Sequence, residues 1–301
     1  MHILLTGGTG FIGRTLAPLL IAQPDTAVTL LLRDDYKGQP LPPLLENLRP
    51  KIDLVYIDLS DYLRTARTVY ERQPDQVIHL AAVGVSDPFL PVKTALAFNL
   101  HATLNLLHAC FEKSSTTHKF IIGRTPGEHS AMNPYATSKA AAWQFCRMYV
   151  RTQQWPIIGA MIYQAYGPGQ PENNLVPAAI KAAHTQVDFP MTAGTQERDW
   201  VYISDVAAGI LTMLHADLMP GTTVDIGTGQ LNSVANVVCN IYEIIGGNGR
   251  PQIGAIQSRP GEMSQQLADA ARTKELIDWQ ATTSLDQGLN KTCQHYQATF
   301  R

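Results

Sequence analysis

The sequence has few of the residues from which disulfide frameworks, metal sites or membrane segments are built. Its cysteines are widely spaced and form no Cys-x-x-Cys pair, so we expect buried free thiols at Cys110, Cys146, Cys239 and Cys293. The nine histidines are also scattered, and no metal site is expected. No apolar run approaches the roughly 20 residues that cross a bilayer. An apolar strand begins at Ile3 and leaves no room for a signal peptide, which predicts a cytoplasmic protein.

An excess of one charge is absent too. The 25 acidic and 23 basic side chains are interspersed and give a formal net charge of -2 at pH 7. Without a basic stripe the chain cannot neutralise several phosphates at once, so no nucleic acid and no membrane partner is expected. With 301 residues, of which 45% are hydrophobic, the chain is long enough to bury a sizeable core.

Short apolar runs alternate with helix-like segments along the first half of the chain. The runs have the length and composition of buried parallel strands, and they cover residues 3–6, 28–32, 54–57, 77–80, 120–122 and 157–162. Helices are expected at residues 11–22, 63–73, 95–110 and 135–152. This alternation predicts an α/β fold with a doubly wound parallel sheet.

A glycine-rich string follows the first strand directly. Thr6-Gly7-Gly8-Thr9-Gly10-Phe11-Ile12-Gly13 has the spacing Gly-x-x-Gly-x-x-Gly at a strand-to-helix junction. Such a turn lets the backbone approach a pyrophosphate, while the helix N-terminus offers free N–H donors and the positive end of its dipole. An ordinary glycine-rich turn is the alternative, but the position directly after a strand favours a dinucleotide-binding site.

The end of the second strand bears on the choice of cofactor. Dinucleotide sites often place an acid there to hold the adenosine ribose, whereas this strand ends at Leu32 and Arg33 follows. Because an arginine pairs well with the 2′-phosphate of NADP, we expect NADP(H) to be preferred over NAD(H). Two alternatives stay open: Asp34 would favour NAD if the register differs by one residue, or Arg33 is simply a solvated surface residue.

A tyrosine and a lysine lie four residues apart on the segment Tyr135-Ala-Thr-Ser-Lys139. The segment follows Asn133-Pro134, a typical helix start, so both side chains are expected on one helix face. A phenol with a pKa near 10 is a poor acid or base at neutral pH, and a neighbouring ammonium favours its ionised form. An exposed pair is the alternative when the motif stands alone, but the glycine turn makes an acid–base role the better interpretation.

These motifs resemble those of the extended short-chain dehydrogenase/reductase family, which contains nucleotide-sugar epimerases, dehydratases and 4-ketoreductases. The resemblance covers nearly the whole chain and includes residues 77–82, 99–110, 166–169 and 198–205. It implies a Rossmann-like sheet with a smaller C-terminal substrate-binding lobe. It also implies an adenine pocket at Asp58 and Leu59 and a supporting role for Asn99. The implied cofactor contacts are Gly7, Thr9, Gly10, Phe11, Ile12, Gly13, Arg33, Asp58, Leu59, Ala81, Ala82, Asn99, Tyr135, Lys139 and Tyr163.

The domain boundaries are expected where the pattern changes. After about residue 167, clusters of Gly and Pro are typical of loops and short elements. We expect the NAD(P)-binding domain over residues 1–163 plus roughly 198–228. The nucleotide-sugar-binding lobe is expected over residues 164–197 and 229–301, because substrate contacts often lie in such loops.

By the same resemblance, a Ser or Thr after the fifth strand is the third catalytic group, and Thr125 falls at that position. Its hydroxyl would hydrogen-bond the reacting carbonyl oxygen, while a plain turn residue before Pro126 is the alternative. Gly123 and Arg124 depart from the family's pattern. Dehydratases of the family carry Thr-Asp-Glu here, but this chain has Thr125-Pro126-Gly127, which argues against a 4,6-dehydratase.

Residues 167–177 and 254–263 resemble the branch that contains CDP-abequose and CDP-paratose synthases. With Arg33, this resemblance implies NADPH-dependent reduction of the C4 keto group of a nucleoside-diphosphate 4-keto-6-deoxy or 3,6-dideoxy sugar. Tyr135 would protonate the alkoxide, Lys139 would hold the ribose, and Thr125 would polarise the carbonyl. The substrate is expected to contact Gln164, Asn174, Arg198 and Arg259. A structural ion pair between Arg198 and Asp205 is the alternative for that arginine.

Two other functions are compatible with the same motifs. An NAD(P)-dependent nucleotide-sugar 4-epimerase would use the same three groups and retain its cofactor, and a non-catalytic NADP sensor would bind the cofactor without turnover. The resemblance also implies a homodimer formed by helices at residues 99–110 and 135–151. Packing against the sheet explains the apolar faces of those helices equally well.

Overall fold

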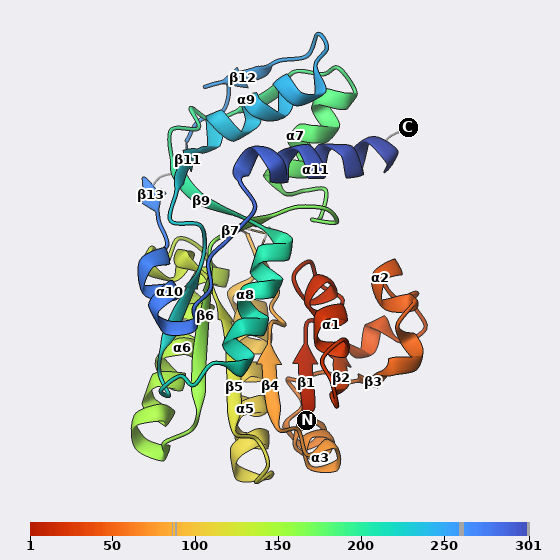
Figure 1. Cartoon of the computed structure of the whole chain (residues 1–301). Helices are drawn as coiled ribbons and strands as arrows, with labels where there is room; N and C mark the ends of the chain where they lie inside the picture. Colours follow the sequence, from red (N-terminus) through yellow and green to blue (C-terminus); the bar gives the residue numbers. More distant parts are fainter. Residues whose placement is uncertain (86, 88, 259–261, 300–301) are drawn as a thin grey trace. The chain divides into compact units, whose positions relative to one another are not determined.

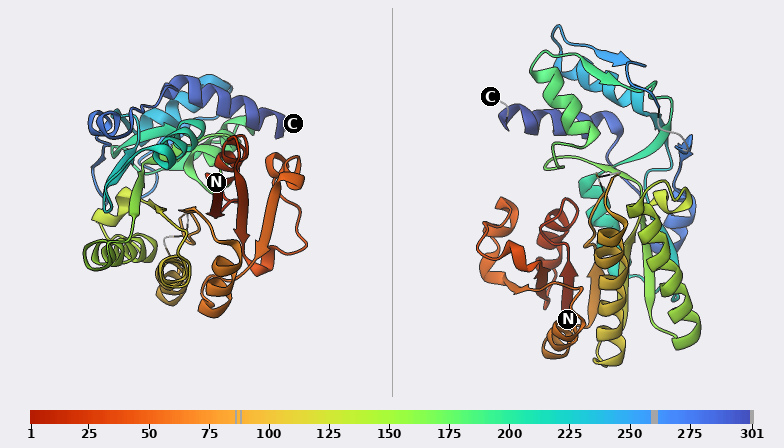
Figure 2. Two further views of the ribbon diagram at one scale, coloured as in Figure 1. Left: turned by 60° about the horizontal axis from the view of Figure 1, so that its bottom comes forward. Right: turned by 180° about the vertical axis from the view of Figure 1, so that it is seen from behind.

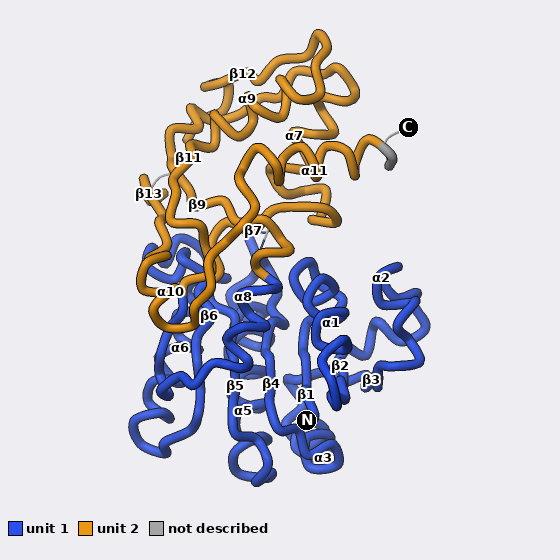
Figure 3. The backbone as a smooth tube through the Cα atoms, in the orientation of Figure 1, with its two compact units in different colours: residues 1–161, 207–224 blue, residues 162–206, 225–301 orange. Residues whose placement is uncertain are grey.

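The computed structural model describes residues 1–85, 87, 89–258 and 262–299 of the chain (Figure 1). The chain divides into two compact units, drawn in different colours in Figure 3. The first unit comprises residues 1–161 and 207–224, and the second comprises residues 162–206 and 225–301.

A seven-stranded sheet is the centre of the first unit. Its order is β3-β2-β1-β4-β5-β6-β10, and every pairing from β3 to β6 is parallel. The chain therefore winds outward in both directions from β1 and β4, and doubly wound sheets bind ligands at the carboxyl ends of strands beside such a switch point. The predicted doubly wound parallel sheet is confirmed. The strands are β1 (His2–Thr6), β2 (Ala27–Leu32), β3 (Ile52–Tyr56), β4 (Gln76–His79), β5 (Lys119–Arg124), β6 (Ile157–Ile162) and β10 (Thr223–Ile226).

Helices cover both faces of this sheet. α1 (Gly13–Ile21) and α8 (Ile203–His215) lie on the face that is in front in Figure 1. The opposite face, seen from behind in Figure 2, carries α3 (Tyr62–Arg72), α5 (Ala102–Glu112) and α6 (Pro134–Gln153). The strands between these layers are apolar on both faces and fully buried at Leu4, Ile78 and Phe120, which explains why they appear in the sequence as continuous apolar runs.

Shorter helices connect these elements. They are α2 (Pro43–Glu46), α4 (Val92–Ala95), the 3₁₀ helices η1 (Asp34–Tyr36), η2 (Arg49–Lys51) and η4 (Pro126–His129), and a π-helix, η3 (Leu96–His101). The single helix predicted over residues 95–110 is therefore wrong in detail, because α4, η3 and α5 share that region. The apolar periodicity continues through the segment, and periodicity alone does not reveal where a π-turn widens the backbone.

The start of α6 is fixed by its local sequence. Asn133 is extended and its side-chain oxygen accepts the N–H of Ala136 at 2.8 Å, which satisfies one of the free donors of the first turn. Pro134 occupies the first helical position, where its missing N–H costs nothing. The helix ends at Gln153, before the left-handed residue Gln154. This cap places Tyr135 in the first turn of the helix.

The second unit is built from shorter elements. Its sheet pairs β9 (Glu197–Tyr202) with β7 (Gln164–Tyr166), β11 (Leu231–Ser233) and β13 (Gln265–Gln266). A further pair joins β8 (Phe189–Met191) and β12 (Pro251–Ile253). The fully buried carboxylate of Asp199 accepts the N–H groups of Thr228, Gly229 and Ala268 at 2.7, 2.8 and 3.2 Å. The helices of this unit are α7 (Leu175–His184), α9 (Val234–Ile245), α10 (Ala270–Ile277) and α11 (Leu285–Thr299).

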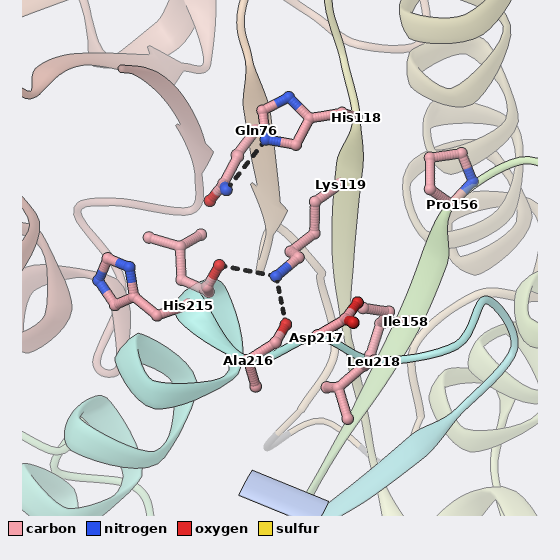
Figure 4. Close-up of a pocket in the computed structure, with 10 residues that line it drawn as sticks. Gln76, His118, Lys119, Pro156, Ile158, His215, Ala216, Asp217 and Leu218 are labelled. Carbon is pink, nitrogen blue, oxygen red and sulfur yellow. Dashed lines mark hydrogen bonds between the residues drawn. The ribbon is translucent and has the colours of Figure 1, made fainter.

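A hollow of about 380 Å³ lies at the amino ends of the central strands (Figure 4). Lys119 opens β5 there and its ammonium donates to the carbonyls of Met213, Leu214 and Ala216 at 3.3, 2.8 and 2.7 Å. These carbonyls end α8, so the lysine caps the negative end of that helix. All three donors of the ammonium are engaged, and the hollow lies at the opposite edge of the sheet from the glycine turn.

None of the helices in the described part of the chain has the length and the apolar composition that a membrane span requires. Over the same part of the chain, no group of three or more His, Cys, Asp or Glu side chains is arranged to hold a metal ion.

Candidate active site

The glycine turn lies between β1 and α1, against the loop that follows β4. Gly7 has φ +72, and a side-chain Cβ there would come within 2.7 Å of the Ala81 backbone nitrogen. A Cβ on Gly13 would collide with the carbonyl oxygen of Gly7. Both positions therefore require glycine, because any side chain would push the turn away from α1 or from the end of β4.

The N-terminus of α1 leaves donors available. Within the described residues, the N–H groups of Phe11 and Ile12 donate to no protein acceptor. Ile12 is the N-cap residue of α1, and its side chain makes no capping hydrogen bond. Such donors at a helix N-terminus suit a phosphate group. The Gly10 N–H donates to the Gly7 carbonyl at 3.0 Å and closes the turn before α1.

The three charged residues directly after β2, Arg33, Asp34 and Asp35, all take part in ion pairs. Arg33 is exposed and contacts Asp35 at 3.0 Å. Asp34 instead accepts two hydrogen bonds from Arg64 of α3, at 2.5 and 2.8 Å, and this pairing lowers the pKa of its carboxyl. The acid that would favour NAD is thus engaged by α3.

The remaining residues expected near the adenine and the cofactor follow β3 and β4. Asp58 and Leu59 are half-buried after β3, and Asp58 accepts the Ser60 N–H at 2.8 Å. Ala81 and Ala82 are half-buried after β4. All four lie at the carboxyl ends of their strands, as do Thr9 and the glycines after β1, so the fold brings them to one edge of the sheet.

Asn99 lies within the π-helix η3 and is buried. Its side chain accepts the Val83 N–H at 2.8 Å and donates to the Val83 carbonyl at 3.0 Å. It also donates to Ser138 Oγ at 3.0 Å, and the Ser138 hydroxyl donates to the Tyr135 carbonyl at 2.8 Å. Asn99 thereby ties the loop after β4 to the first turn of α6, and a π-turn is a frequent feature of functional sites.

A second set of hydrogen bonds links β1 to η3 through His79. The Thr103 hydroxyl donates to the Asn99 carbonyl at 2.8 Å, so it accepts from His79 Nε2 at 2.9 Å. His79 Nδ1 is then the acceptor for the Thr6 hydroxyl at 2.8 Å, and Thr6 Oγ1 accepts the Ala81 N–H at 3.1 Å. Burial lowers the pKa of His79 to about 3, so its ring is neutral.

Tyr135 and Lys139 lie one turn apart on α6, as predicted. Lys139 is 4% exposed, and this burial lowers the pKa of its ammonium. Burial also raises the pKa of the Tyr135 phenol, and the Glu128 carboxylate raises it further. The surrounding protein groups thus shift this pKa in the direction opposite to the one that the Tyr-Lys spacing predicts, because desolvation and a carboxylate oppose formation of a phenolate.

Thr125 lies between β5 and η4 and serves as the N-cap of η4. Its hydroxyl accepts the Gly127 N–H at 3.3 Å, so it has the turn role expected before Pro126 and keeps its own proton to donate. A Cβ on Gly127 would lie 3.6 Å from Thr125 Oγ1 and 3.5 Å from the Ala136 Cβ. The hydroxyl and the first turn of α6 therefore both lie against Gly127.

Glu128 and Arg124 form a buried ion pair that the sequence analysis did not identify. Arg124 Nη2 lies 2.6 Å from Glu128 Oε2, and their side chains are 9% and 3% exposed. The only signal in the sequence was that Arg124 departs from the family's pattern. A charge four residues from an opposite charge is commonly a solvated pair, and nothing in the local sequence marks this one as buried.

The expected substrate-binding residues belong to the second unit, with Tyr163. The Tyr163 hydroxyl donates to Asp225 Oδ2 at 3.1 Å, and burial raises the pKa of this phenol. Gln164 is exposed at the start of β7. Asn174 precedes α7 and donates to the Pro171 carbonyl at 3.1 Å. Arg259 lies outside the described residues.

Arg198 has a partner other than the expected one. Its guanidinium contacts Glu262 Oε1 at 2.9 Å and donates to the Met263 carbonyl at 3.0 Å. The alternative pairing with Asp205 is wrong, because the Asp205 carboxylate accepts from the Thr282 hydroxyl at 3.1 Å and the Thr283 N–H at 2.9 Å. Pairing of β13 with β9 brings Glu262 close to the arginine, a long-range contact that sequence spacing does not reveal.

Comparison with known proteins assigns the chain to a family. The profile of the NAD dependent epimerase/dehydratase family matches residues 3–227. This chain belongs to that family. An uncharacterised UDP-glucose epimerase of Bacillus subtilis is 30% identical, with all of this chain and 99% of the relative covered. A dTDP-glucose 4,6-dehydratase of Neisseria gonorrhoeae is 27% identical over 98% of this chain and 95% of its own.

Solved structures show the same fold. The UDP-glucose 4-epimerase of Thermotoga maritima superposes with a TM-score of 0.87 at 23% identity, and all of both chains is covered. The UDP-glucuronic acid 4-epimerase of Bacillus cereus, solved with UDP-glucuronic acid and NAD, also gives a TM-score of 0.87 at 23% identity, over 99% of this chain and 100% of its own. Membership confirms the predicted resemblance to the extended short-chain dehydrogenase/reductases, whose members are NAD(P)-dependent enzymes that act on nucleotide sugars.

Proposed function

We propose that this enzyme is an NADPH-dependent 4-ketoreductase that acts on a nucleoside-diphosphate 4-keto-6-deoxy or 3,6-dideoxy sugar. Reduction of a ketone needs a hydride, which a bound nicotinamide supplies, and a proton for the oxygen that becomes an alcohol. The observation that carries the proposal is the setting of Tyr135, which lies one turn from Lys139 on α6, in the helical turn that packs against Gly127 as Thr125 also does. Burial raises the pKa of its phenol, so the phenol is protonated before the reaction starts, as a general acid requires.

The remaining groups of the site have separate roles in this reaction. The Thr125 hydroxyl donates a hydrogen bond to the carbonyl oxygen of the sugar, and this polarises the ketone. The same hydroxyl oxygen accepts the Gly127 N–H. Lys139 holds the nicotinamide ribose from the same face of α6 as Tyr135. Asn99 and Ser138 hold the first turn of α6, so the phenol is fixed relative to the loop after β4.

The preference for NADPH is part of the proposal. Arg33 follows β2 and its side chain is 61% exposed, which leaves the guanidinium accessible to a 2′-phosphate. Arg64 holds the Asp34 carboxylate, and this pairing supports Arg33 rather than Asp34 as the residue that meets the adenosine ribose. The glycine turn and the free N–H groups of Phe11 and Ile12 would hold the pyrophosphate.

An NAD(P)-dependent 4-epimerase is the second candidate, and the names of several relatives favour it. An epimerase first removes a proton from a sugar hydroxyl and therefore needs a phenolate. The protein groups around Tyr135 oppose that form. A dehydratase is disfavoured because Pro126 and Gly127 stand where the family's dehydratases have Asp and Glu.

The proposal also includes contacts of the substrate with Gln164, Asn174, Arg198 and Arg259, and a contact of the cofactor with Tyr163. The lobe of residues 164–197 and 229–301, which belongs to the second unit, is proposed to bind the nucleotide sugar. Homodimerisation through η3, α5 and α6 is proposed as well, since Phe145 and Met148 are exposed on α6.

The test is the purified enzyme with NADPH or NADH and the products of CDP- and dTDP-sugar 4,6-dehydratases. A reductase oxidises added NADPH in step with loss of the keto sugar, and it oxidises NADPH faster than it oxidises NADH. An epimerase instead interconverts a nucleotide hexose without added cofactor, which would overturn the proposal. A non-catalytic sensor binds NADPH and leaves every sugar unchanged.

A further inference from the structure

Three polar side chains lie fully buried beside the carboxyl ends of β1 and β4. Thr6 and His79 are partners in the register of these two strands, and Thr103 lies on α5. Apolar side chains of the same shape could fill this part of the core at little cost, because a hydrogen bond within the protein replaces one with water. A buried polar group whose hydrogen bonds are all made instead fixes one geometry. The neighbours of the three side chains show which geometry this is.

The hydrogen bonds of these side chains run in a single direction. The Ala81 N–H donates to Thr6 Oγ1 at 3.1 Å, and the Thr6 hydroxyl donates to His79 Nδ1 at 2.8 Å. His79 Nε2 donates to Thr103 Oγ1 at 2.9 Å, and the Thr103 hydroxyl donates to the Asn99 carbonyl at 2.8 Å. Because each hydroxyl donates once and accepts once, the ring must be neutral with its proton on Nε2. The two ring nitrogens therefore hold two different parts of the molecule.

The Nδ1 side of His79 leads to the glycine turn. Thr6 directly precedes Gly7, and a Cβ on Gly7 would come within 2.7 Å of the Ala81 nitrogen. Because Nδ1 takes the Thr6 proton, the Thr6 oxygen can accept the N–H of that same nitrogen. The turn that is proposed to bind the pyrophosphate is held in this way against the loop after β4.

The Nε2 side leads to the helix that carries the phenol. Thr103 gives the carbonyl of Asn99, a residue of the π-helix η3, a side-chain donor from four residues later in the chain. The side chain of Asn99 in turn donates to Ser138 Oγ at 3.0 Å, and the Ser138 hydroxyl donates to the Tyr135 carbonyl at 2.8 Å. A continuous set of buried hydrogen bonds therefore joins His79 to the first turn of α6.

We infer that His79 is a positioning residue of the active site, whose Nδ1 fixes the glycine turn against Ala81 and whose Nε2–H fixes Asn99 and, through it, the turn of Tyr135. The catalytic part of this inference rests on the proposed role of Tyr135 as the acid of a ketone reduction. Since the ring is fully buried, His79 acts only through these neighbours. One side chain thus sets the cofactor turn and the proton donor relative to each other.

Two substitutions separate the two nitrogens. Asparagine places an oxygen near the position of Nδ1 and does not reach Thr103, whereas glutamine places an amide N–H near the position of Nε2 and offers Thr6 no acceptor. His79→Asn should lower kcat at saturating NADPH about five- to tenfold and leave the dissociation constant of NADPH within about twofold. His79→Gln should raise that dissociation constant about five- to tenfold and leave kcat within about twofold.

Another histidine of the same sheet is the matched control. His2 of β1 contacts the Arg72 carbonyl through Nδ1 at 2.7 Å and Thr29 Oγ1 through Nε2 at 2.8 Å, at the amino end of the strand. His2→Asn and His2→Gln remove contacts of the same kind and should change neither constant. Equal losses of kcat and of affinity in both His79 variants would indicate general damage to the core and overturn the inference. No loss in either variant, or the two losses exchanged, would contradict it as well.

Thr103 provides the test if the His79 variants do not fold. Thr103→Val keeps the shape of the side chain and removes its hydroxyl, so it should lower kcat as His79→Asn does and leave the affinity for NADPH unchanged. Thr103→Ser keeps the hydroxyl and should restore kcat. A wild-type kcat in Thr103→Val, or an equal loss in Thr103→Ser, would contradict the role of the Nε2 hydrogen bond.

Nitrogen NMR tests the tautomer without a substrate. In protein labelled with ¹⁵N-histidine, the two ring signals that are absent from His79→Gln belong to His79. At neutral pH they should show a protonated Nε2 and an unprotonated Nδ1, and a proton on Nδ1 would overturn the inference. If the protein reduces no keto sugar, the proposed function fails. The tautomer and the effect of His79→Gln on cofactor affinity then still decide the inference.

Discussion

The side-chain amide of Asn99 donates to the Ser138 hydroxyl at 3.0 Å, and through it reaches the carbonyl of Tyr135. The same side chain also accepts the Val83 N–H and donates to the Val83 carbonyl. A residue of the π-helix therefore joins the loop after β4 to the turn of α6 that carries the phenol. The first turn of α6, which carries the phenol, is thus held by a buried amide.

Replacing that amide should destabilise the fold as well as the site. Asn99→Ala removes the side-chain partner of the half-buried Val83 N–H and carbonyl and of the buried Ser138 hydroxyl, and an unsatisfied buried group costs about 1–3 kcal/mol. We expect the free energy of unfolding to fall by about 3 kcal/mol, measured by urea denaturation. Asn105→Ala on α5 is the control, because Asn105 donates to the Leu59 and Ser60 carbonyls near the surface. Equal losses in both variants would contradict the special role of Asn99.

His79 should make the stability of the protein depend on pH. Its pKa falls from 6.5 to about 3 on folding because the ring is buried. Below pH 6.5 the unfolded chain binds a proton that the folded chain does not, so the free energy of unfolding falls as pH decreases through this window. Over the whole window the loss is roughly 5 kcal/mol. Above pH 6.5 this contribution is constant.

The slope of unfolding free energy against pH tests that expectation. His79→Gln should show a shallower decrease between pH 6.5 and 4 than the wild type, even though it is less stable at pH 7. His101→Gln, which alters an exposed histidine of η3, should keep the wild-type slope. An unchanged slope in His79→Gln would mean that the ring is not held neutral by burial.

Tyr135 should be needed for the chemical step and not for cofactor binding. Tyr135→Phe should lower kcat for the keto sugar by about a hundredfold or more, because a general acid contributes roughly 10²–10⁴. The dissociation constant of NADPH should change little. Tyr149→Phe removes another phenol of α6, one that contacts His108 Nε2 at 2.9 Å, and should keep most of the activity. Comparable losses in the two variants would argue against an acid at residue 135.

Arg33 should set the preference between the two nicotinamide cofactors. Arg33→Ser should weaken NADPH binding by about tenfold to a hundredfold, since a hydrogen bond to a charged group contributes about 1.5–3 kcal/mol. NADH binding should be unaffected, as measured by fluorescence titration of both cofactors. Arg67→Ser on α3, where the arginine is exposed and pairs with Glu71, is the control. A parallel loss for NADH would show that Arg33 does not recognise the 2′-phosphate.

The local geometry of the glycine turn and of the Tyr135–Lys139 pair could be predicted because its signals are local. The glycine turn is contiguous and directly follows a strand, and Tyr135 and Lys139 are one helical turn apart with Asn133 and Pro134 marking the helix start. Their position at the carboxyl edge then follows from the strand order. Sequence spacing is sufficient where the chemistry needs neighbours along one element.

The features that sequence reasoning missed depend on burial or on distant strands. Arg124 and Glu128 have the spacing of an ordinary surface pair, and only the contacts with Trp143 and Thr223 enclose them. Arg198 meets Glu262 because β13 pairs with β9. The π-turn at Asn99 has no distinct periodicity. Each of these results from tertiary packing, which local patterns do not specify.

The fate of the hydride distinguishes the proposed reaction from its nearest alternative. NADPH carrying two deuterium atoms at C4 of the nicotinamide should be incubated with the enzyme and a CDP- or dTDP-linked 4-keto-6-deoxy sugar, and the product analysed by mass spectrometry and NMR. A 4-ketoreductase transfers one deuterium to C4 of the sugar for each NADPH consumed. If the keto sugar is recovered unchanged, and a nucleotide hexose offered in its place is inverted at C4 without gaining deuterium and without consuming NADPH, the result contradicts reduction and identifies an epimerase.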